Sequence, residues 1–263
     1  MLKIETVATK QYQIDSRNIN TILRKPCTID WGDGTSSVIT QLNQFKHTYK
    51  KEKPHTILVK DLDTSVMTFR GDTQIVSIDG ELPVLDEGSL IGFFQGAINL
   101  RHVGDDIFIN NSHQKNISAL CQGVPYLESL KFITRLTSAE DISYILDNCK
   151  YLVSIDELAG WGENVIDARR AFSGSELLVS PRRDILAAMG KLKIADGIFM
   201  ENPSMSVAYT YFSENGELES IRGAFYGCSN IKPIDKNWLY YLPMMVTTDR
   251  TEIFNKSVRL NGI

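Results

Sequence analysis

A repeat of about 26 residues runs through most of the chain and constrains its fold more than any other feature. The clearest copy spans residues 221–234, and Phe225 is taken as its anchor. Equivalent anchors recur at Phe69, Phe94, Cys121, Leu146, Phe172, Phe199 and Phe254. An apolar residue stands six positions after every anchor, from Ile75 to Leu260. Units of this size cannot bury an apolar face alone, so the period predicts a stack with a continuous core.

The residues around each anchor predict the structure of one unit. In the clearest copy, Ile221, Ala224 and Phe225 have the spacing of one apolar helix face. Two positions after the anchor stands Gly227, and glycine or asparagine occupies most equivalent positions. Glu201 is an exception. Such residues adopt the left-handed conformation that ends a helix, so we expect a short helix followed by an extended segment in each unit.

The residues before the repeats have a different pattern, with apolar residues on alternate positions. Residues 27–31 alternate and lead into Asp33-Gly34, a strong signal for a tight hairpin. Residues 45–49 and 55–59 also favour strands. We therefore predict an α+β chain in which a small antiparallel β-domain (1–62) precedes a solenoid of repeats (63–263).

Two resemblances sharpen this prediction. The repeats are similar to BspA-like leucine-rich repeats, most closely at residues 224–234, and this similarity implies recognition or scaffolding rather than catalysis. The segments Trp31-Gly32-Asp33-Gly34-Thr35 and His47-Thr48-Tyr49 resemble the PKD-like, immunoglobulin-type sandwich. PKD-like modules before BspA-like repeats look like the organisation of bacterial surface proteins and of some phage virion proteins.

Composition argues against several classes of protein. The chain is 43% hydrophobic and 23% charged, with a formal net charge of -4 and no dense basic run, so we expect no nucleic-acid partner. No apolar run is long enough to cross a membrane, and the N-terminus lacks the pattern of a secretory signal. Four widely spaced cysteines are expected to be reduced and mostly buried: Cys27, Cys121, Cys149 and Cys228.

No residue pattern predicts catalysis, a metal or a cofactor. The phosphate-binding, dinucleotide-binding and nucleophile-elbow motifs are absent from the sequence. His47 and His55 flank a predicted loop and could approach each other, although a structural role is favoured. Asp30 and Asp33 are too few for a calcium site and are better explained by a turn.

The leading hypothesis is therefore a non-enzymatic virion structural or receptor-recognition component, assembled in the host cytoplasm. Its partners would be other virion proteins or a host surface receptor, contacted through protein or glycan, and it could form a homo-oligomer. Two alternatives remain: a cell-surface adhesin fragment, and an enzyme with an unrecognised site. Tyrosine and tryptophan combine apolar area with a polar group, so the candidate contact residues are Tyr126, Tyr151, Trp161, Tyr209, Tyr211, Tyr226 and Trp238.

Overall fold

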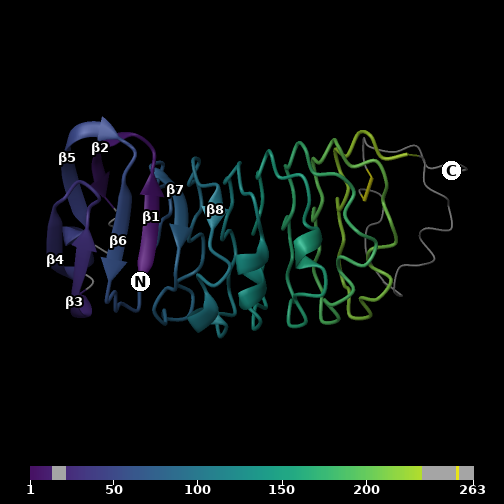
Figure 1. Ribbon diagram of the computed structural model, residues 1–263. Helices are drawn as coiled ribbons and strands as arrows, with labels where there is room; N and C mark the ends of the chain where they lie inside the picture. The colour runs from purple at the N-terminus through teal and green to yellow at the C-terminus, as the bar shows by residue number, and fades with distance from the viewer. Residues whose placement is uncertain (14–21, 233–252, 255–263) are drawn as a thin grey trace, which may run out of the picture.

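The computed structural model describes residues 1–13, 22–232 and 253–254. It is an elongated molecule in which a β-sheet near the N-terminus is followed by a row of turn-rich units (Figure 1). The strands are β1 Leu2–Thr6, β2 Thr9–Gln13, β3 Ile22–Asp30, β4 Ser36–Gln41, β5 Lys46–Lys53, β6 Thr56–Lys60, β7 Ile75–Asp79 and β8 His102–Val103. Four short 3-10 helices are η1 Leu42–Gln44, η2 Ile109–Asn111, η3 Lys131–Arg135 and η4 Asp156–Leu158.

The main sheet has six strands in the order β4-β3-β6-β1-β7-β8. It is mixed, because β7 and β8 are parallel while the other pairs are antiparallel. Strand β1 is central: Leu2 lies opposite Val59 of β6, and Ile4 lies opposite Ile78 of β7. Strands from both sides of the predicted boundary at residue 62 thus form one sheet, and the division into two domains stays a prediction.

The first strands follow the alternation of the sequence. In β3, Cys27 and Ile29 are buried while Thr28 is exposed. The chain then turns at Gly32 and Gly34, both with positive φ, and enters β4. The predicted hairpin at Asp33-Gly34 is confirmed.

The repeated units are held by backbone hydrogen bonds between neighbours. In the segment around each anchor, N–H groups donate to the following unit: Cys121 N–H to the Ile145 carbonyl at 2.9 Å, for example. In the later extended segment they donate to the preceding unit, as from Val179 N–H to the Val153 carbonyl at 3.1 Å. Isolated parallel bridges add to this pairing, including one between Asp141 and Asp167.

The predicted fold class is therefore wrong. Among the described residues there is no α-helix, the main sheet is mixed rather than antiparallel, and most of the repeat region is turns and loops. An α-helix needs each N–H to bond four residues back within the same segment, whereas these N–H groups bond the next unit. Positive φ at Ala119, Tyr144 and Arg170, two residues before their anchors, also interrupts any helix.

The left-handed residues after the anchors are nevertheless confirmed. Gly123 has φ 71° and Asn148 has φ 60°, and Glu201 adopts the same conformation at φ 57°. These residues turn the chain from the anchor segment into the extended segment. The predicted conformation is present, but it ends a series of β-turns instead of a helix.

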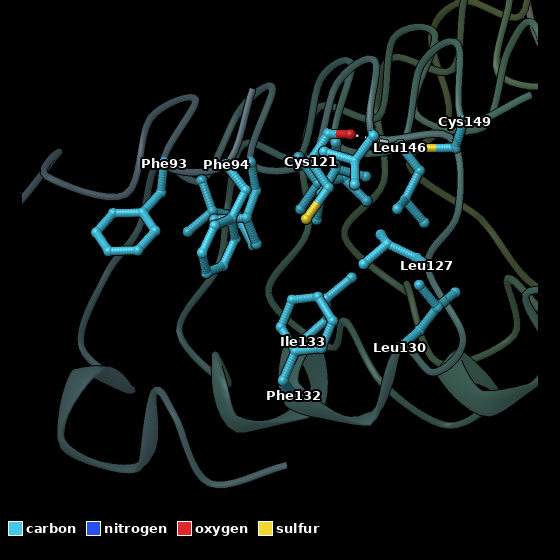
Figure 2. Close-up of a cluster of buried hydrophobic side chains, with 14 of the residues drawn as sticks. Phe93, Phe94, Cys121, Leu127, Leu130, Phe132, Ile133, Leu146 and Cys149 are labelled. Atoms are coloured by element: carbon cyan, nitrogen blue, oxygen red, sulfur yellow. Dashed lines mark hydrogen bonds between the residues drawn. The ribbon is translucent and has the colours of Figure 1, made fainter. Parts of the chain in front are cut away.

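The apolar side chains of successive units form one buried cluster, of which Figure 2 shows the part around Phe94 and Cys121. Phe93 and Phe94 meet edge to face with ring centroids 4.8 Å apart, and the Cys149 thiol donates to the Cys121 carbonyl at 3.2 Å (Figure 2). All four cysteines are free and buried, as predicted. Burial raises the pKa of the Cys121 thiol well above its ordinary value, which keeps the group protonated and unreactive.

Candidate binding face

The extended segments present alternate side chains to the core and to solvent. After the anchor Leu146, Tyr151 and Val153 are exposed, whereas Leu152 between them is buried. Backbone bonds fix the register between units: Tyr151 N–H donates to the Pro125 carbonyl at 3.2 Å. Outward side chains of adjacent units therefore lie in rows.

Five of these outward side chains form what we call the tyrosine–aliphatic face: Tyr126, Tyr151, Val153, Leu177 and Val179. They are between 38% and 53% exposed. Large apolar side chains on a solvated surface are ordinary singly, but here they occupy equivalent positions on three successive units. Contiguous apolar patches of this kind mark contact sites.

Ring contacts hold one end of the face in order. Tyr126 and Tyr151 stack with centroids 4.9 Å apart and an interplanar angle of 18°. The Arg101 guanidinium lies 4.8 Å from the Tyr126 ring centroid, within cation–π range. The side chains are thus ordered before any partner binds, which lowers the entropic cost of association.

Charges flank the apolar side chains instead of interrupting them. Lys150 and Glu176 form an ion pair at 3.5 Å with both side chains more than half exposed, and Glu128 is also exposed. An apolar centre with a polar, solvated margin is the usual anatomy of a protein interface.

The predicted contact residues differ in exposure and do not all lie on one surface. Tyr126, Tyr151 and Tyr209 are exposed, and Tyr226 is half-buried. Of these, Tyr126 and Tyr151 lie together, while Tyr209 packs edge-on against Tyr211 at 5.7 Å. Trp238 lies outside the described residues.

Two of the predicted residues are buried and cannot contact a partner in this conformation. The Trp161 ring N–H donates to the Leu136 carbonyl at 3.2 Å, and the Tyr211 hydroxyl donates to the Pro181 carbonyl at 3.1 Å. Both bonds join neighbouring units. Their polar groups therefore serve packing, and the two side chains are buried between units.

Sequence reasoning missed the aliphatic half of the face. Val153 and Val179 stand seven positions after their anchors, between the buried positions six and nine. Position seven directly follows the inward position six in an extended segment and therefore points outward. An apolar residue there was the available signal, and it was overlooked because attention went to aromatic residues.

A second, polar cluster lies in the β-domain around Tyr49. The His47 ring meets the Tyr49 ring edge to face with centroids 4.6 Å apart, and the His55 ring stacks on Tyr49 at 3.4 Å. Asp33 accepts hydrogen bonds from Thr35 and lies 3.0 Å from His47 Nε2; these contacts lower the pKa of Asp33 to about 2. The carboxylate is therefore held by the hairpin.

The turn also explains the other aspartate considered for calcium. Asp30 accepts the Gly32 N–H at 2.9 Å, while Asp33 accepts the Thr35 N–H at 3.0 Å. Across residues 1–13, 22–232 and 253–254, no group of three or more histidine, cysteine, aspartate or glutamate side chains is placed to hold a metal ion. Over the same residues, no helix has the length and hydropathy needed to span a membrane.

The cavity beside this cluster has mixed charge. Its volume is about 230 Å³, and its walls include Asp33, Tyr49, His55 and Lys53. Burial raises the pKa of Tyr49 to about 12, so its hydroxyl remains protonated and donates to the Trp31 carbonyl at 3.2 Å. The Thr35 hydroxyl also lines the cavity, but it donates to Asp33 within the hairpin, and we take the tyrosine–aliphatic face as the better candidate site.

No family model matches the chain, and neither a curated protein nor a solved structure is similar enough to it to count as a match.

Proposed function

We propose that this chain is a non-enzymatic binding protein, a structural or receptor-recognition component of a virion, that contacts a partner protein through the tyrosine–aliphatic face. The observation that carries the proposal is the row of exposed Tyr126, Tyr151, Val153, Leu177 and Val179 on three adjacent units. Tyrosine and arginine are enriched among residues that dominate binding energy.

The chemistry of the face favours a protein partner over a glycan. A sugar needs an aromatic plane to stack on and polar side chains to bond its hydroxyls. Here Tyr126 is covered by Arg101 on one side and by Tyr151 on the other. The neighbouring Leu177 and Val179 offer no hydrogen bonds, and they suit an apolar protein side chain.

The virion assignment is tested by where the chain is found. Purified virus-like particles and envelope membranes from the source culture are compared by quantitative mass spectrometry. Stoichiometric enrichment in particles is expected. Enrichment in envelopes alone would contradict the virion assignment and favour a cell-surface adhesin. Absence from both fractions would contradict both assignments.

The face itself is tested with two tyrosines of one unit. A photo-crosslinking amino acid at Tyr151 should join the chain to its neighbour in intact particles. Tyr144 is the matched control, because it is also an exposed tyrosine near an arginine, Arg170 at 5.8 Å, but it lies in the segment before the anchor. Equal crosslinking from both positions, or none from Tyr151, would contradict the role of the face.

A further inference from the structure

The main sheet ends at β4, which lies at one end of the elongated molecule (Figure 1). In the described part of the chain, β3 is its only neighbouring strand. In the other direction the sheet passes through β8 into the row of units. Among the described residues no strand pairs with the other edge of β4, and this is where a further strand could extend the same sheet.

The residues of β4 do nothing to prevent this extension. The strand reads Ser-Ser-Val-Ile-Thr-Gln and has no charge and no proline. Strand β5 is the internal contrast: in the described residues it pairs only with β2, and its eight residues include four lysines and one glutamate. Charged residues on an edge oppose strand addition, so β5 is protected and β4 is not.

The backbone of β4 is also directed suitably. Thr40 N–H donates to the Gln44 side chain at 2.7 Å and hence points away from β3. Backbone direction alternates along an antiparallel strand, so the N–H and carbonyl of Val38 and of Ser36 point the same way. The Val38 side chain is 68% exposed.

We propose that a second copy of this chain adds to this edge, with the two β4 strands antiparallel about a two-fold axis at Val38. Each Val38 then exchanges both backbone hydrogen bonds with its counterpart. Ser36 lies opposite Thr40 of the second copy, whose N–H exchanges the Gln44 side chain for the new strand, and every β4 side chain across the junction is uncharged.

The self-complementary pattern favours a second copy over an unrelated strand. Val38 faces Val38, so two exposed apolar side chains cover each other without a charge nearby on either strand. A two-fold contact uses the same edge of both copies and closes after two. One strand pair buries less than the roughly 1,000 Å² expected of a permanent interface, so the dimer is reversible and its population depends on concentration.

The first test is the mass in solution of the full chain from about 1 µM to about 1 mM, the range in which weak dimers form. Sedimentation should show a monomer at the low end and a doubled mass at the high end. Val38→Lys places like charges opposite each other and should raise the dissociation constant at least about tenfold. Thr28→Lys is the control, because Thr28 lies opposite Val38 on β3, one strand away from the edge, and should not shift the equilibrium.

A crosslink reports the register directly. Hydrogen-bonded antiparallel pairs have Cα atoms about 5.5 Å apart, a distance that a disulfide can bridge. Val38→Cys should therefore give a covalent dimer under mild oxidation, while Thr28→Cys should not. The four native cysteines are buried and contribute little background. A mass that stays monomeric throughout, or equal crosslinking from positions 38 and 28, would overturn the proposal.

Discussion

Replacing Phe199 with alanine should remove a central member of the buried aromatic row. The Phe199 ring is fully buried, with centroids 5.9 Å from Phe172, 5.6 Å from Phe225 and 5.2 Å from Tyr211. Truncation of a buried phenylalanine costs about 3–5 kcal/mol. We expect the upper part of this range, because three ring contacts, each about 0.5–1.5 kcal/mol, disappear together.

The measurement is equilibrium unfolding in urea, followed by circular dichroism. Since a whole domain is stable by only about 5–15 kcal/mol, Phe199→Ala could unfold part of the chain, and Phe199→Leu serves as the milder variant, expected to lose about 1–2 kcal/mol. Val179→Ala is the control at an exposed position of the neighbouring unit, with an expected change within about 0.5 kcal/mol. A loss below about 1 kcal/mol for Phe199→Ala would refute the argument that these three ring contacts contribute to the stability of the stack.

Three further outcomes are expected. Burial lowers the pKa of His55, so stability should be full above about pH 6.5 and should fall as the pH decreases toward the folded pKa. In denaturation at pH 7 and pH 5, His55→Phe should flatten this slope, and an unchanged slope would assign it to other groups. Asp147 is buried and accepts hydrogen bonds from Gln122 at 2.9 Å and from Ser173. Asp147→Ala leaves these donors unpaired and should lower the free energy of unfolding in urea by about 1–3 kcal/mol. An unchanged free energy of unfolding would show that water replaces the carboxylate. The Cys121 thiol should resist alkylation until denaturant is added, as read by mass spectrometry, and rapid labelling of the native protein would show local opening.

Local sequence predicted the conformations that depend on neighbouring residues. The glycines after the anchors have the expected positive φ. The apolar residues six positions after the anchors, such as Leu178 and Met205, are buried. The hairpin at Asp33-Gly34 also depends only on adjacent residues. In each case the determining interaction spans a few positions of the chain.

The helix assignment failed because its determinant lies in another unit. Apolar residues at positions i, i+3 and i+4, such as Ile221, Ala224 and Phe225, suit one face of a helix. They also suit successive turns whose N–H groups bond carbonyls of the next unit. For Cys121 that partner is the Ile145 carbonyl. Positive φ at Ala119 and Tyr144 had no glycine to signal it, so only the neighbouring unit reveals why the backbone adopts it.

The sequence predicted only part of the tyrosine–aliphatic face, because residue type does not show whether a side chain is exposed. Tyr126 and Tyr151 were identified from their residue type, but residue type could not separate them from Trp161, whose ring N–H finds a carbonyl inside the core. Position within the unit would have done so. The same rule of position identifies Val153 and Val179.

The directions of the backbone hydrogen bonds have a consequence for how this chain could lengthen. The backbone hydrogen bonds between units run from anchor segments to the following unit and from extended segments to the preceding one. The anchor segments on successive boundaries therefore present equivalent backbone donors and acceptors. Duplicating or deleting one whole unit, from Leu146 to Ala171 for example, rejoins edges that already match. The backbone hydrogen bonds of the anchor segments are therefore kept when the row changes length by gene duplication in steps of one unit.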